Sequence, residues 1–209
     1  MEKNATFWNK AAARYSKSPV KDMEAYAYTL ERTKEYLNTD MAGYEFGCGT
    51  GSTAIELAPH LGHLTATDFS TNMIEIAQEK ARTAEIETLD FRVETLVDIA
   101  NVHPRYDVVM GFNILHLFHD IEHNLAIAHG LLNSGGLLIT KTPCLKGSLI
   151  LALLRPILTL GRWIGKIPYV DFLTTTELEK MVIDQGFEII ETGDYPKSPP
   201  SHFIVARKP

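Results

Sequence analysis

The sequence predicts an α/β protein whose seven strands form a doubly wound, mostly parallel sheet with helices on both faces. Strand-like and helix-like segments alternate from residue 44 to residue 142, as in parallel strands joined by helical crossovers. The run Tyr106–Phe112 is almost continuously apolar, which is typical of a strand covered on both faces. Only a short segment separates the runs Phe187–Thr192 and His202–Ala206, so we expect them to form an antiparallel pair at one edge.

The composition indicates one globular domain, residues 1–209, because 209 residues with 45% apolar and 22% charged content can bury a substantial core. The formal net charge of −6 argues against a general nucleic-acid binder, which usually carries a basic surface. Cys48 and Cys144 are too few for a disulfide framework or a zinc site. The first residues lack the apolar core of a signal peptide, so we expect a cytoplasmic protein.

Residues 1–38 are expected to form an N-terminal helical cap with a break near Ser18-Pro19. The aromatic residues Phe7, Trp8 and Tyr15 fit two interpretations. They belong to a helix that packs on the domain, or to a flap that carries Tyr15 over a ligand site.

The stretch 44–51 is an apolar run that ends in an acid and continues into three glycines spaced two apart, followed by a helix-like segment. Such a turn exposes backbone N–H groups at a helix start, which suits a strongly polar ligand that approaches the main chain closely. A dinucleotide fingerprint would place its third glycine at position 52, which is Ser52. Glu45 would repel a pyrophosphate but would attract the ammonium of a methionine-like group.

A second strand, His63–Asp68, also ends in an acid, and Ser70 is a plausible N-cap for the helix that follows. The Asp68 carboxylate can accept both hydrogen bonds of a ribose diol, whereas the alternative is a helix cap or a surface acid. Phe69 and Met73 either cover that ligand or belong to the core.

Further segments complete the predicted order. We expect a strand at Leu89–Glu94, a helix at Leu117–Leu132 ended by the glycines of 133–136, and a strand at Leu137–Thr142. Thr174 to Glu177 reads as a capping box that opens a helix ending at Gln185.

The apolar stretch Leu145–Val170 interrupts the alternation, and residues 145–173 are assigned as an insertion. Arg155, Pro156 and Arg162 break it too often for a membrane-spanning helix. It packs into the core, covers an apolar substrate as a lid, or lies on a membrane surface or dimer interface. We expect no stable membrane insertion, and the oligomeric state stays open.

The motifs Glu45–Gly51, Thr67–Ser70, Tyr106–Val109 and Leu132–Leu138 have the order and spacing of class I S-adenosylmethionine (AdoMet) methyltransferases, which the chain resembles over about residues 40–142. The resemblance implies a Rossmann-like fold with AdoMet as cofactor. It assigns glycines of the turn to the methionine portion, the acid of the second strand to the ribose, and the end of the fourth strand to the methyl group. The predicted cofactor-binding residues are Tyr15, Glu45, Gly47, Cys48, Gly49, Asp68, Phe69, Met73, Thr95, Leu96 and Phe112.

Two departures from the family pattern matter. Thr95 stands where many members have an aspartate that binds the adenine amino group, so Thr95 and the Leu96 backbone would take that contact. Phe112-Asn113-Ile114-Leu115 stands where the methylases of planar nitrogens carry Asn-Pro-Pro-Tyr or a similar tetrapeptide, which argues against nucleobase or glutamine methylation.

His116 and His119 follow the fourth strand, where a methyl acceptor is expected, and are the candidates for a general base; the alternative for His116 is a partly buried side chain that satisfies backbone groups. Their spacing by three could also suggest a metal site, but no third ligand is evident beyond Asp120 or His123, and we predict no metal. We therefore predict an AdoMet-dependent methyltransferase that acts on a small or lipid-like acceptor, not on nucleic acid. The alternatives are a non-catalytic AdoMet-binding regulatory protein and, more weakly, an NAD-dependent oxidoreductase.

Overall fold

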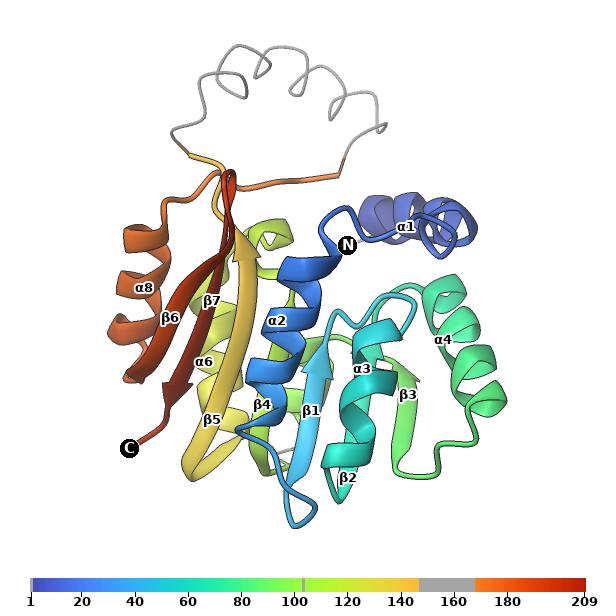
Figure 1. Cartoon of the computed structure of the whole chain (residues 1–209), viewed down its shortest axis with the longest axis horizontal. Coiled ribbons are helices and arrows are strands. Elements are labelled where there is room, and N and C mark those ends of the chain that lie inside the picture. Colours follow the sequence, from blue (N-terminus) through green and yellow to red (C-terminus); the bar gives the residue numbers. More distant parts are fainter. Residues whose placement is uncertain (1, 103, 147–167) are drawn as a thin grey trace.

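The computed structural model of the chain describes residues 2–102, 104–146 and 168–209, and its elements follow the predicted alternation (Figure 1). The strands are β1 (Ala42–Phe46), β2 (His63–Asp68), β3 (Leu89–Val93), β4 (Tyr106–Phe112), β5 (Leu132–Pro143), β6 (Glu188–Lys197) and β7 (Pro200–Arg207). The α-helices are α1 (Glu2–Tyr15), α2 (Met23–Lys34), α3 (Ser52–Leu57), α4 (Thr71–Thr83), α5 (Leu96–Ala100), α6 (Ile121–Leu131) and α8 (Thr175–Asp184). Two 3-10 helices, η1 (Ala58–His60) and η2 (Leu115–Leu117), complete the described elements.

The described strands form one seven-stranded sheet in the order β3-β2-β1-β4-β5-β7-β6. The first five strands are parallel, and β7 pairs antiparallel with both β5 and β6, which confirms the predicted pair at one edge. The chain builds outward from β1 through β2 to β3 and then continues on the other side of β1 with β4 and β5. The carboxyl ends of β1 and β4 therefore flank the switch point where doubly wound folds bind ligands.

Alternate side chains of the central strands enter two cores on opposite faces of the sheet. Val109 and Leu138 face a cluster that includes side chains of α5, α6 and α8. Met110 and Ile139 face a second cluster with side chains of α2, α3 and α4. In Figure 1, β1 and β5 point towards the side of the sheet where α1 and the N-terminal end of α2 lie.

The helix predicted at Leu117–Leu132 is shorter than expected. Asp120 accepts a hydrogen bond from the His123 N–H at 2.9 Å and thereby caps α6, which begins at Ile121. The glycines of 133–136 do not cap it, because β5 begins at Leu132. The left-handed Gly135, with φ of 80°, donates its N–H to the Lys208 carbonyl instead.

Three other local predictions are confirmed. The N-terminal region forms two helices, and α1 ends before the break at Ser18-Pro19 while α2 begins after it. Ser70 caps α4, and Thr174 forms the reciprocal capping box with Glu177. Most of the predicted insertion 145–173 lies outside the described residues, but its described ends meet where the Lys146 N–H bonds the Leu173 carbonyl at 3.0 Å. Within the described part of the chain, no helix is long and apolar enough to cross a membrane.

Candidate functional site

The glycine turn after β1 has the conformation that its sequence predicts. Gly47, Gly49 and Gly51 have φ angles of 65°, 55° and 75°, in the left-handed region that other residues rarely adopt. The Cys48 N–H donates to the Thr67 carbonyl of β2 at 2.9 Å. The turn is thereby fixed against the neighbouring strand, with α3 beginning immediately after it.

Asp68, at the end of β2, lies directly beside this turn. Its two carboxylate oxygens accept the N–H of Gly49 at 3.0 Å and the N–H of Ser70 at 2.8 Å, and the residue is 8% exposed. Burial raises the pKa of Asp68, while the two backbone donors act in the opposite direction. Each oxygen can accept a further hydrogen bond, as a ribose diol would require.

Glu45 is a buried acid on β1 without a hydrogen-bond partner for Oε2 among the described residues. Burial and then the charge of Asp68 raise the pKa of Glu45 to about 8. An unpaired buried carboxyl is costly unless a positive group compensates it. A cation beside Glu45 would favour its carboxylate form, so Glu45 fits the positive amino-acid portion of AdoMet and does not fit a pyrophosphate.

Replacing Glu45 by Gln should weaken the dependence of stability on pH. Because the folded pKa of about 8 exceeds the ordinary value of 4.5, the folded wild type binds more protons in this window and loses stability as the pH rises through it. Glutamine stays neutral, so the free energy of unfolding of Glu45→Gln, measured by thermal unfolding, should exceed that of wild type by an amount that grows towards pH 8, up to about a few kcal/mol. Equal pH slopes for both proteins would contradict the assignment.

Helix α1 brings Tyr15 over the glycine turn. The Asn9 side chain accepts hydrogen bonds from the Ser70 hydroxyl at 2.6 Å and the Asn72 N–H at 3.2 Å, which attaches α1 to the start of α4. The Tyr15 ring lies 3.8 Å from the position that a Cβ on Gly49 would occupy, and 51% of the residue is exposed. Tyr15 therefore lies where the flap interpretation requires it.

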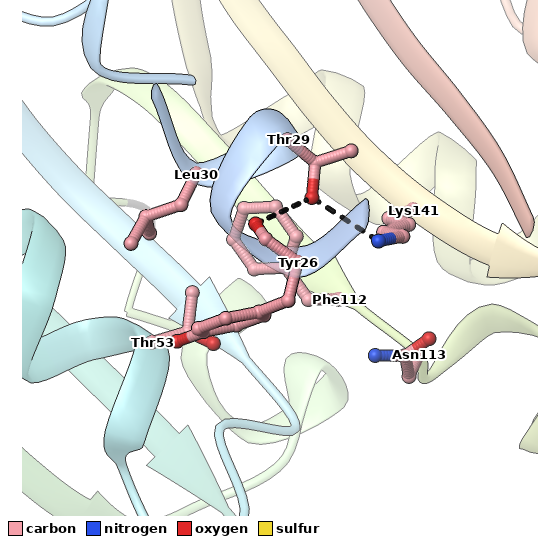
Figure 2. Close-up of a pocket in the computed structure, with 7 residues that line it drawn as sticks. All are labelled: Tyr26, Thr29, Leu30, Thr53, Phe112, Asn113 and Lys141. Carbon is pink, nitrogen blue, oxygen red and sulfur yellow. Dashed lines mark hydrogen bonds between the residues drawn. The ribbon is translucent and has the colours of Figure 1, made fainter. Parts of the chain in front are cut away.

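A pocket opens on the other side of the turn, at the carboxyl ends of β4 and β5 and against the inner face of α2 (Figure 2). Its cavity volume is about 20 Å³, which is room for about one water-sized group. Its lining residues are Tyr26, Thr29, Leu30, Thr53, Phe112, Asn113 and Lys141. Phe112 was predicted from the sequence, but the contributions of α2 and β5 were not. The one sequence signal was Lys141, a charged residue inside an apolar strand.

The two candidate histidines occupy different environments. His116 lies in η2, where its Nδ1 is buried without a partner among the described residues and burial lowers its pKa to about 4. His119 is exposed and stacks on Tyr169 with ring centroids 3.8 Å apart. The described residues contain no group of three potential metal ligands.

The remaining predicted cofactor-binding residues already take part in the core or in a helix cap. Met73 is buried and Phe69 is partly buried. Thr95 uses its hydroxyl to cap α5 through a capping box with Asp98, and Leu96 is a core residue. Their contacts with adenine stay predictions.

Sequence reasoning did not select Glu94, at the end of β3. Its Oε2 is buried and has no partner among the described residues, and burial raises its pKa. The family pattern selects the neighbouring Thr95, which occupies the position of the family aspartate, although Glu94 is the acid at this strand end.

Comparisons with known proteins match this chain to methyltransferase domains and folds. A family described as "Methyltransferase domain" matches residues 44–138. The chain is 29% identical over 164 residues to the hybrid PKS-NRPS synthetase mpsA of Macrophomina phaseolina, covering 71% of this chain and 4% of that protein. It is 29% identical over 151 residues to the ubiquinone biosynthesis O-methyltransferase of Azorhizobium caulinodans, covering 70% of this chain and 58% of that protein. The chain thus spans less than two thirds of either relative.

The fold also matches a solved structure. Magnesium protoporphyrin IX methyltransferase ChlM from Synechocystis, solved with bound SAH, superposes with a TM-score of 0.73 over 99% of this chain and 95% of ChlM at 20% identity. The predicted fold class is therefore confirmed.

Proposed function

We propose that this chain, a class I AdoMet-dependent methyltransferase by its fold and its methyltransferase domain, transfers a methyl group from AdoMet to a small or lipid-like acceptor. The observation that carries the proposal is the pair of buried acids beside the left-handed glycine turn. Oε2 of Glu45 has no hydrogen-bond partner among the described residues, and Asp68 accepts the N–H of Gly49 in the turn, so the site suits a ligand with a positive amino-acid end and a ribose.

The residues of the chain have separate tasks in this mechanism. Asp68 holds the ribose, Glu45 compensates the ammonium, and the backbone of Gly47 and Gly49 allows the methionine portion to approach closely. AdoMet, when bound, supplies an electrophilic methyl group on a sulfonium. The protein then has to align the acceptor, exclude water and remove a proton where the acceptor carries one.

The acceptor class is supported by the form of the site and by the relatives. One relative is named for ubiquinone biosynthesis, and the other is a hybrid PKS-NRPS synthetase. The formal net charge of −6 does not favour a nucleic acid. The pocket beside Phe112 is bounded by the Tyr26 ring and by Leu30, so the part of an acceptor that enters it is small and lies against apolar side chains.

Neither histidine lines the pocket beside Phe112, and His116 is the better candidate for a base because of its protonation state. Its low pKa keeps the imidazole neutral near pH 7, and its Nδ1 has no hydrogen-bond partner among the described residues. The same low pKa makes it a weak base, so His116→Asn should lower kcat by only about tenfold, below the usual range for general bases. His119→Asn should have a smaller effect, because His119 is exposed. Initial rates for both variants test this, and a larger loss for His119→Asn would reverse the assignment.

The proposal as a whole is tested by calorimetry with AdoMet and by measuring S-adenosylhomocysteine formation with phenols, small carboxylic acids and isoprenoid quinols. We expect one AdoMet per chain and turnover with at least one acceptor. Stoichiometric binding with no product across the panel would indicate a regulatory AdoMet-binding protein. Tight NAD binding without AdoMet affinity would indicate an oxidoreductase.

A further inference from the structure

Lys141 is a charged side chain in the interior of this protein. It lies at the carboxyl end of β5, next to Phe112 of β4 in the sheet register, and is 8% exposed. Its Nζ donates to the Ala25 carbonyl at 3.2 Å and to the Thr29 hydroxyl at 3.1 Å, both on α2. An ammonium has three N–H donors, so one remains.

No carboxylate compensates this charge at short range. Among the described residues Lys141 forms no ion pair within 4.0 Å, and the acid whose charge acts on it is Asp22, at the N-cap of α2. Burial lowers the pKa of Lys141 and Asp22 opposes that change. A buried ammonium held by two neutral acceptors is costly for folding, and an apolar side chain of similar size would be cheaper.

The ammonium faces the pocket described above. Figure 2 shows the Lys141 nitrogen beside Thr29, on the same side of the pocket as the Asn113 amide. Lys141 is the charged member of the pocket lining, which otherwise consists of neutral polar and apolar side chains. The acidic groups Glu45 and Asp68 thus lie beside the glycine turn, whereas Lys141 lies next to Phe112.

We propose that Lys141 binds an anionic oxygen of the methyl acceptor, so that the acceptor is a small organic anion such as a carboxylate or a phenolate. This inference rests on the proposed methyl transfer. The separation of charges supports it, because the acids favour a cationic donor and the lysine favours an anion within the same cleft. The third N–H supplies a charge-assisted hydrogen bond, and Tyr26 and Phe112 provide apolar walls for the rest of the molecule.

The test uses the full chain, with benzoate as probe and benzamide as its neutral counterpart, titrated with and without S-adenosylhomocysteine. Wild type should bind benzoate about tenfold more tightly than benzamide, as for one charge-assisted hydrogen bond. Lys141→Met should abolish this preference and leave AdoMet affinity unchanged. Lys180→Met, which removes an exposed lysine paired with Asp184 on α8, serves as the matched control and should keep the preference.

Four outcomes would overturn the inference. In the first, wild type shows no preference for benzoate over benzamide at millimolar concentration. In the second, Lys141→Met keeps the preference for benzoate. In the third, Lys141→Met loses AdoMet affinity instead, in which case the lysine binds the carboxylate of the cofactor. The fourth is a purely structural role, in which Thr29→Val and Lys141→Met lose the preference together and unfold at lower temperature. We expect Thr29→Val to keep the preference and Lys141→Met to unfold at the same or a higher temperature. AdoMet binding to wild type tests the proposed function separately.

Discussion

Gly51→Ala should strongly destabilise the protein. Gly51 has a φ of 75°, and a Cβ there would lie 2.5 Å from Phe91 Cζ and 2.8 Å from Ala77 Cβ. The left-handed backbone costs about 1–2 kcal/mol for alanine, and overpacking adds roughly 1–3 kcal/mol. We expect a loss of about 3–4 kcal/mol in the free energy of unfolding, or about 10 °C in melting temperature.

Gly49→Ala is the matched comparison. Its φ is 55°, but the nearest atom to an added Cβ is Tyr15 Cε1 at 3.8 Å, so the packing penalty is absent. Its stability loss should stay near 1–2 kcal/mol, while its AdoMet affinity should fall because the methyl group occupies the surface that the ligand approaches. Thermal unfolding and calorimetry separate the two effects. Equal stability losses would show that the contacts behind Gly51 do not constrain the turn.

Asp68→Ala should cost about 1.5–3 kcal/mol of AdoMet affinity, roughly a 10- to 150-fold rise in Kd. The carboxylate accepts the N–H groups of Gly49 and Ser70 and, in the proposed function, also offers oxygens to the ribose. Asp68→Asn keeps one carbonyl oxygen as acceptor and should lose less. Calorimetry with AdoMet measures both variants.

Asp90→Ala controls for the loss of a negative charge, since Asp90 is an exposed acid on β3 paired with Arg92. Its AdoMet affinity should match that of wild type. Unchanged AdoMet binding by Asp68→Ala would mean that the ribose does not contact this residue. A thermal melt of each protein distinguishes weaker binding from a smaller folded fraction.

Local chemistry explains why so much of the fold followed from the sequence. Apolar alternation and turn residues identify strands and helices within a few positions, so the seven strands in chain order and the glycine turn at Gly47, Gly49 and Gly51 were predicted correctly. Where periodicity alone was used, as at the start of α6, the prediction was wrong. The cap that Asp120 forms decided that boundary.

The sequence by itself predicted the glycine turn and the two acids that we propose for the cofactor, because they are specified by short-range patterns at the ends of β1 and β2. Only the tertiary structure revealed the pocket that we propose for the acceptor. Lys141 and Thr29 are 112 residues apart, and no local pattern predicts that α2 packs over the carboxyl end of β5. The tertiary packing makes Lys141 a buried charge, since on its own strand it is simply one polar residue in an apolar run.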